Sequence, residues 1–152
     1  MELIIHTDGG SRGNPGEGAV GVVIEQVVNS PAKQDLASRD KPHIVTQFGK
    51  RIGVVTNNEA EYQAVIHALR EIMLRITNYE LAITKLSFFL DSLLVVSQLN
   101  GLWKIKKPHI RQLLLQVRSH EQEIGIPVTY SHVPREQNAE ADLLVNQTLD
   151  SG

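Results

Sequence analysis

The most constraining feature of this sequence is the stretch Asp8 to Gly16, nine residues that include four glycines, a proline and an asparagine. Glycine and proline disfavour the interiors of helices and strands, so the stretch predicts a bend between the apolar runs Leu3 to Ile5 and Ala19 to Ile24. An Asp-Gly pair is also typical of a hairpin turn, but a two-residue hairpin does not need so many residues. We therefore expect a strand that ends in the carboxylate of Asp8, followed by a turn whose backbone amides meet a ligand.

Length and composition narrow the class of protein. A chain of 152 residues fits a single domain over residues 1–152, and 41% hydrophobic residues is ordinary for a globular protein. There is no cysteine, so metal ligands must be oxygen or imidazole. No apolar run approaches the roughly 20 residues of a membrane span, and the first predicted strand begins without a secretory n-region. We predict a cytoplasmic monomer with no membrane partner and no organic cofactor.

The apolar patterns predict an α/β fold. Thr56 and Glu59 form a capping box, which opens an amphipathic helix that ends near Asn78. The polar connection Gln26 to Lys41 indicates a long exposed hairpin link. The order of elements predicts an antiparallel meander extended by βα units, with helices on the sheet faces. The remaining predicted elements are strands at 43–53, 86–90 and 126–133 and helices at 92–99, 108–125 and 136–149.

Four carboxylates occupy positions typical of a site. Asp8 and Asp91 each end a predicted strand, where open α/β sheets bind ligands, although Asp91 could also be a helix N-cap. Glu61 and Asp142 each border the apolar stripe of a predicted helix, although the helix dipole favours any acid near the start. If the four converge at ~4 Å, each pair repels by roughly 4 kcal/mol at an effective dielectric of 20. Such a cluster requires cations, and Mg²⁺ best matches an oxygen-only set.

Histidines and one basic segment add weaker signals. His132 ends the last predicted strand ten residues before Asp142, so it could move protons near the acids or be an ordinary surface histidine. His6 has the side-chain parity of Asp8, and we interpret it as structural. The net charge of −2 argues against nucleic-acid binding, yet residues 92–120 contain five Lys and Arg and no acid. That segment could contact phosphates or form a solvated helix face.

Four ordered motifs resemble those of a known family. They are Asp8 to Gly16, Thr56 to Tyr62 (Thr-Asn-Asn-Glu-Ala-Glu-Tyr), Leu90-Asp91-Ser92, and His132 with Asn138 and Asp142. In this order, over nearly the whole chain, they resemble type 1 ribonuclease H, with the prokaryotic single-domain members nearest.

The resemblance implies a five-stranded mixed sheet, three antiparallel strands and then two parallel ones, flanked by helices. It implies endonucleolytic cleavage of the RNA strand in RNA/DNA hybrids, leaving 5′-phosphate and 3′-hydroxyl ends. By motif position, two Mg²⁺ ions, with Mn²⁺ as the alternative metal, would be held by Asp8, Glu61, Asp91 and Asp142. His132 would assist proton transfer or product release.

The resemblance also implies how the hybrid binds. Asn14 beside Gly13, together with Asn57 and Asn58, would contact the minor groove and the 2′-hydroxyls of the RNA, which suits recognition by shape. A short basic stretch, Lys104, Lys106 and Lys107, replaces the longer basic protrusion of some bacterial members and would contact phosphates. The connection Gln26 to Lys41 is longer than usual for the family, and the sequence assigns it no role.

Two alternatives stay open at this point. The same fold could carry another metal-dependent nuclease activity, because a fold does not specify one reaction. A non-catalytic hybrid- or RNA-binding module is the second, and the presence of all four acids argues against it.

Overall fold

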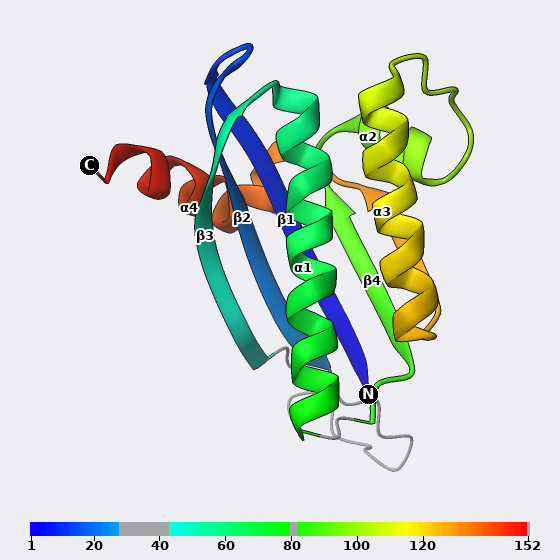
Figure 1. Ribbon diagram of the computed structural model, residues 1–152. Coiled ribbons are helices and arrows are strands. Elements are labelled where there is room, and N and C mark those ends of the chain that lie inside the picture. Colours follow the sequence, from blue (N-terminus) through cyan, green and yellow to red (C-terminus); the bar gives the residue numbers. More distant parts are fainter. Residues whose placement is uncertain (28–42, 80–81, 152) are drawn as a thin grey trace.

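The computed structural model describes residues 1–27, 43–79 and 82–151. Within them, five strands form one mixed sheet in the order β3-β2-β1-β4-β5 (Figure 1). Neighbours β1–β2 and β2–β3 are antiparallel, whereas β1–β4 and β4–β5 are parallel, which confirms the predicted topology. The strands are β1 (Glu2–Gly13), β2 (Gly16–Val27), β3 (His43–Val55), β4 (Lys85–Leu90) and β5 (Val128–His132).

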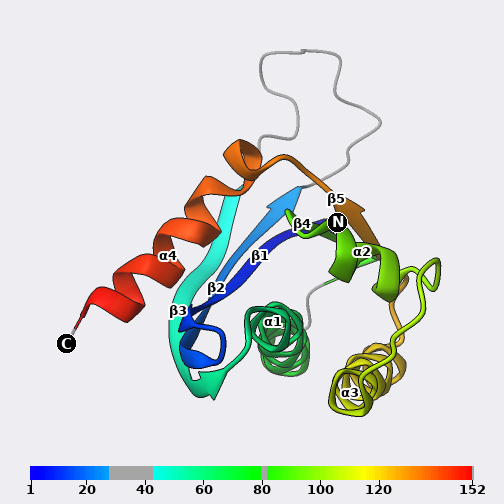
Figure 2. The ribbon, with the colours of Figure 1, turned by 90° about the horizontal axis from the view of Figure 1, so that it is seen from above.

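The helices cover both faces of this sheet. Figure 2 shows α1 and α3 on one face and α4 on the other. The last predicted helix is divided in two, because Asn138 is buried and donates its side-chain amide to the carbonyl of Thr7 in β1, at 2.9 Å. The elements are α1 (Asn57–Tyr79), α2 (Leu93–Leu99), α3 (Pro108–Ile124), a 3₁₀ turn η2 (Arg135–Asn138) and α4 (Ala139–Asp150).

The predicted end of β1 at Asp8 is wrong. The ladder with β2 continues from Asp8 opposite Gly21 to Gly13 opposite Gly16, so most of the glycine-rich stretch is paired strand and not a ligand-binding turn. The glycines serve close packing: a Cβ on Gly9 would lie 2.2 Å from the carbonyl of Ala60 in α1. Glycine in a strand often marks such a close backbone approach.

On the side that faces β4, the hydrogen-bonded pairing of β1 ends close to Asp8. The parallel pairing with β4 stops at His6 opposite Phe89. Asp8 therefore lies just beyond the carboxyl end of the parallel pair, which is the position where α/β sheets bind ligands. The predicted location of Asp8 at a strand end is thus correct for the β1–β4 pair and wrong for the β1–β2 pair.

Helix α1 holds the largest apolar face against the sheet. Its capping box is confirmed: the Thr56 amide donates to the Glu59 carboxylate at 2.8 Å, and the Glu59 amide donates to the Thr56 hydroxyl at 3.2 Å. Apolar residues of α1 at helical spacing are buried in the core; Met73 and Ile76, which continue this spacing, are only partly buried, and Ile72 is buried in their place. The buried members are Tyr62, Val65, Ile66, Leu69 and Ile72.

The opposite face approaches α4 closely. A Cβ on Gly21 would lie 2.1 Å from the carbonyl oxygen of Ala141, and a Cβ on Gly49 would lie 2.0 Å from the hydroxyl of Thr148. Two glycines on neighbouring strands thus let α4 lie against the sheet backbone. This contact sets the position of every side chain that α4 directs toward β1.

The predicted hairpin link lies mostly outside the described residues. Gln26 and Val27 belong to β2, and residues 28–41 fall in the part that the structure does not describe. Among the described residues, no helix has the length and apolar character needed to cross a membrane.

Candidate active site

Three predicted acids from three elements lie together. Asp8 comes from β1, Glu61 from the start of α1, and Asp91 directly follows β4. One carboxylate oxygen from each lies within 4.8 Å of the others. Asp8 and Glu61 are only 7% and 8% exposed, whereas Asp91 is half-buried. The structure therefore gathers acids that are far apart in the chain into one buried group.

Asp91 is not the cap of the helix that follows it. The hydroxyl of Ser92 accepts the backbone amide of Val95 at 3.2 Å and caps α2. The carboxylate of Asp91 consequently has no capping role and is available to the acid group.

The fourth acid, Asp142, borders the same pocket from α4. This pocket has a volume of ≈ 460 Å³ and is lined by all four acids together with Asn57, Asn58 and Ser92, among others. Asp142 lies outside the group of three that shares the 4.8 Å limit, and its side chain is half-buried. Its charge still raises the pKa of Asp8, so the fourth carboxylate acts on the same site.

Burial, followed by the crowding of like charges, raises the pKa values of two of the acids. Burial raises the pKa of Asp8 to about 7; a hydrogen bond with Glu61 opposes this shift, and the charges of Asp91 and Asp142 add to it. Burial, followed by the charge of Asp8, raises the pKa of Glu61 well above its ordinary value. Both shifts have the sign expected when carboxylates are removed from water and placed side by side.

The donor set fits a divalent cation. One oxygen of Glu61, Oε2, is buried and has no hydrogen-bond partner. A buried carboxylate oxygen without a donor is costly, and a metal ion would satisfy it. Within the described residues, none of the ion pairs involves Asp8, Glu61, Asp91 or Asp142. Oxygen donors alone suit the hard ions Mg²⁺ and Mn²⁺.

Two of the predicted substrate-binding asparagines, Asn57 and Asn58, line the acidic pocket, and Asn14 contacts Asn57. The Asn14 side-chain oxygen accepts the backbone amide of Asn57 at 2.9 Å. The Asn57 side-chain oxygen accepts the amide and hydroxyl of Ser11 at 3.0 and 3.1 Å. These bonds join the β1–β2 hairpin to the start of α1. Gly13 occupies the hairpin turn with φ 108°, a conformation that favours glycine.

The predicted basic residues lie outside the pocket. Lys104, Lys106 and Lys107 are exposed in the loop between α2 and α3. Figure 1 shows this loop at the same end of the molecule as the β1–β2 hairpin and the start of α1. Lys107 is among the charges that lower the pKa of Glu59, after the larger effect of the Thr56 backbone hydrogen bond. The basic loop is thus near the asparagines but does not line the acidic site.

His132 also lies outside the pocket lining. It is exposed as the last residue of β5, and its parallel partner is Leu90, the residue before Asp91. His6, by contrast, stacks on Phe89 with ring centroids 5.3 Å apart, which agrees with the structural interpretation. A catalytic role for His132 stays a prediction.

Several residues that line the pocket were not predicted from the sequence. They are Ser11, Arg12, Ser92, Arg135 and Asn146. Two carried a usable signal: Asn146 follows Asp142 by four positions on a helix, and Arg12 has the strand parity of Asp8. Arg135 carried no such signal in the sequence, because the position of the 3₁₀ turn η2 is what places it at the pocket.

Comparisons with known proteins agree with this fold. A family described as "Reverse transcriptase-like" matches residues 6–148. The "Bifunctional protein Rv2228c" of Mycobacterium tuberculosis is 32% identical over 99% of this chain, which spans only 36% of that protein. The "Ribonuclease HI" of Halobacterium salinarum is 38% identical over 94% of this chain and 62% of that protein. This chain therefore spans about a third to two thirds of the length of these relatives.

Solved structures extend the comparison. The crystal structure of RNase H1 from Halobacterium salinarum NRC-1 has a TM-score of 0.80 and 33% sequence identity, covering 100% of each chain. The crystal structure of LC11-RNase H1 in complex with RNA/DNA hybrid has a TM-score of 0.78 and 34% identity, covering 97% of this chain and 96% of that one.

Proposed function

Since the chain belongs to the type 1 ribonuclease H family, we propose that it is an endoribonuclease that hydrolyses the RNA strand of RNA/DNA hybrids. The observation that carries the proposal is the cluster of Asp8, Glu61 and Asp91 within 4.8 Å. A similar protein, LC11-RNase H1, has been crystallised with a hybrid, which supports this class of substrate. In this proposal, residues 1–152 are one catalytic domain, and cytoplasmic location and a monomeric state stay predictions.

We assign metal binding to Asp8, Glu61, Asp91 and Asp142, with two Mg²⁺ ions per site or Mn²⁺ in their place. When bound, such ions supply activation of the attacking water and stabilisation of the leaving 3′ oxygen, so that 5′-phosphate and 3′-hydroxyl ends result. The protein's part is to hold the four carboxylates in place. Because burial raises the pKa of Asp8 and Glu61, binding of a cation is expected to displace a proton from this pair.

Recognition of the hybrid is assigned to the end of the molecule around the pocket. Gly13, Asn14, Asn57 and Asn58 would contact the 2′-hydroxyls across the minor groove, because asparagine both donates and accepts hydrogen bonds. The basic loop would contact phosphates, and these contacts would weaken with salt. His132, next to Asp91 across the sheet, would assist proton transfer or product release.

One panel of substrates tests the proposal. A labelled hybrid, an RNA duplex, a DNA duplex and DNA with a single ribonucleotide are incubated with Mg²⁺, with Mn²⁺ or with a chelator. We expect the RNA strand of the hybrid to be cut with metal and to stay intact with the chelator. End-group analysis should find 5′-phosphate and 3′-hydroxyl.

A second candidate function, a non-catalytic hybrid-binding module, predicts a different result in the same panel. That protein would bind the hybrid and leave it uncut with either metal. The four acids and the unpartnered Glu61 oxygen favour the enzyme.

A further inference from the structure

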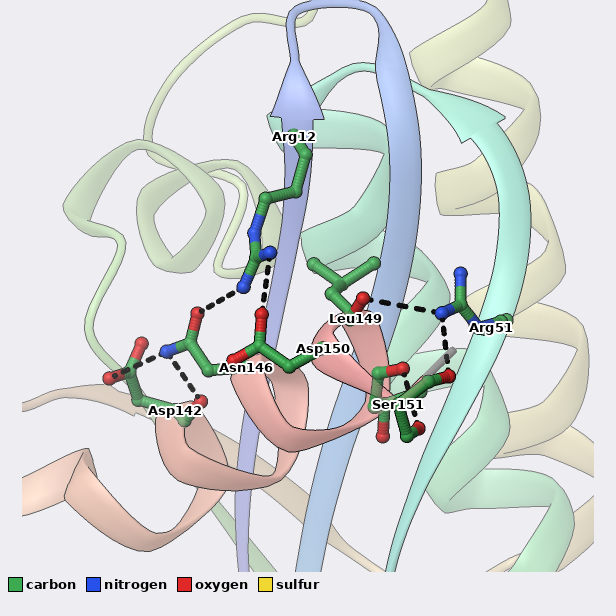
Figure 3. Close-up of polar contacts among 8 residues, drawn as sticks. Arg12, Arg51, Asp142, Asn146, Leu149, Asp150 and Ser151 are labelled. Atoms are coloured by element: carbon green, nitrogen blue, oxygen red, sulfur yellow. Dashed lines mark hydrogen bonds and ion pairs between the residues drawn. The ribbon is translucent and has the colours of Figure 1, made fainter.

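A chain of polar contacts links the tip of β1 to Asp142 (Figure 3). The side-chain nitrogen of Asn146 donates to the backbone oxygen of Asp142 at 3.1 Å and to its carboxylate at 3.4 Å. The side-chain oxygen of Asn146 accepts a bond from Arg12 at 3.4 Å. Arg12 also pairs with Asp150, at 2.7 Å. Asn146 therefore stands between Arg12 and one of the four acids.

Arg12 determines which way the Asn146 amide faces. An asparagine side chain can present either its oxygen or its NH₂ group to a neighbour, but a guanidinium can only donate. The oxygen of Asn146 must therefore face Arg12, and the NH₂ group is then directed at the carboxylate of Asp142. The two oxygens of Asp142 that accept from the NH₂ group favour the same orientation, and without Arg12 the amide would lose the contact that holds its oxygen on the other side.

Asp142 is the acid that most needs such support. Asp8, Glu61 and Asp91 lie within 4.8 Å of one another, whereas Asp142 borders that group from α4. The 3.4 Å contact from Asn146 to the Asp142 carboxylate is longer than the ~2.9–3.0 Å typical of N–H···O bonds, so it orients the carboxylate and still lets it move toward the other three. Arg51 of β3 holds the end of the same helix through the carbonyls of Leu149 and Ser151, at 3.2 and 3.0 Å.

Resting on the function proposed above, we propose that Asn146 and Arg12 are positioning residues that orient Asp142 toward a divalent cation. Partners that orient metal ligands typically contribute ~10–100-fold to metal affinity. The Arg12 guanidinium lies on the hairpin that also carries Asn14, so the network joins a predicted substrate-binding hairpin to the fourth acid.

Calorimetric titration of the substrate-free protein with Mn²⁺ tests this inference without using activity. We expect Asn146→Ala and Arg12→Ala to weaken Mn²⁺ binding by about 10-fold or more. Arg12→Lys keeps one donor for the Asn146 oxygen and should recover part of the affinity. Gln147→Ala, an exposed neighbour on the same helix, is the matched control and should bind Mn²⁺ as the wild type does.

Kinetics separate positioning from a structural role. For Asn146→Ala, the Mg²⁺ concentration needed for half-maximal cleavage should rise while KM for the hybrid stays near the wild-type value. Thermal unfolding in a chelator should match that of the wild type. If Asn146→Ala fails to fold, the same measurements are made on Arg12→Ala, which leaves the sequence of α4 unchanged.

The outcomes distinguish the two proposals. Wild-type Mn²⁺ affinity in both Asn146→Ala and Arg12→Ala would overturn the positioning role and leave the ribonuclease proposal intact. A wild-type protein that binds Mn²⁺ and never cuts hybrid would overturn the activity, while weaker binding by the variants would still support positioning. A wild-type protein that binds no Mn²⁺ would overturn both.

Discussion

The acidic pocket and the basic loop, residues 104–107, place their charged side chains in opposite environments. Figure 1 shows the basic loop at the same end of the molecule as the start of α1, the helix that carries Glu61. In the pocket, Asp8 and Glu61 are buried and their pKa values are raised. In the loop, all three lysines are exposed, and the ordered contacts are made by the backbone: the carbonyl of Ile105 accepts a bond from Arg111 at 2.7 Å.

Burial and exposure suit the two regions to different tasks. Buried like charges interact strongly and need a compact counter-ion, so the pocket is suited to chemistry that depends on a fixed geometry. Exposed charges are screened by salt over about 8–10 Å, so the loop is suited to a salt-dependent attraction of a polyanion that does not require a fixed geometry. We therefore expect pocket variants to lose turnover and loop variants to lose affinity.

The largest expected effect comes from Asp91→Asn. Replacing the carboxylate by a neutral amide keeps the shape of the side chain but lowers the affinity of the pocket for cations. Hybrid cleavage should therefore fall below detection. Hybrid affinity and the folded structure should be largely preserved. Single-turnover cleavage and fluorescence anisotropy measure the two properties. Turnover within tenfold of the wild type would contradict the separation of pocket and loop.

His132→Ala should have the next largest effect. A residue that aids proton transfer typically contributes ~10²–10⁴-fold, so the variant should be slowed but retain activity. The rate is measured at saturating hybrid and metal, with Ser131→Ala, the exposed neighbour on β5, as the control. Equal rates for His132→Ala and the control would make His132 an ordinary surface histidine.

Asp8→Asn should inactivate the enzyme and yet stabilise the metal-free fold. The pKa of Asp8 is raised from 3.8 to about 7, first by burial, so the folded state holds the proton more tightly than the unfolded state does. This contribution to stability is fully present below about pH 3.8 and is lost as the pH rises through about 7. At about pH 8 the variant should be more stable by about 1–3 kcal/mol.

Urea unfolding in a chelator, from about pH 4 to about pH 8, measures this difference. The stability of the wild type should fall with rising pH relative to the variant, and added Mg²⁺ should restore it, because a ligand that binds the folded state stabilises it. If Asp8→Asn were less stable than the wild type at about pH 8, the charge of Asp8 would not destabilise the folded state.

The smallest expected effect is in the basic loop. Replacing Lys104, Lys106 and Lys107 by glutamine should weaken hybrid binding and leave kcat unchanged. Each lost phosphate contact should flatten the log–log dependence of affinity on salt by roughly 0.9. Hybrid binding is measured over a series of salt concentrations. The control is Lys85→Gln, a lysine at the start of β4 that is distant from the loop in the sequence. An unchanged slope would make the loop a solvated surface.

Local patterns predicted the helices well, and long-range packing explains most of the corrections. The capping box at Thr56 and the stripe of α1 depend on residues a few positions apart, and both were confirmed. The end of β1 was wrong because Gly9 was interpreted as a breaker, whereas it permits contact with α1. The support of Asp142 by Asn146 and Arg12 needs α4 docked on the sheet, which no local pattern describes.

Local sequence patterns were sufficient to predict the types and order of the elements and to select the four acids, because periodicity, capping and turn residues act over a few positions. The folded chain, by contrast, was needed to show that Asp8, Glu61 and Asp91 lie together, that Asp142 borders them, and that His132 lies outside the pocket lining. The physical reason is that these distances depend on strand pairing and on how closely helices approach the sheet. Glycines without side chains set that approach, and the partner that each one meets lies far away in the chain.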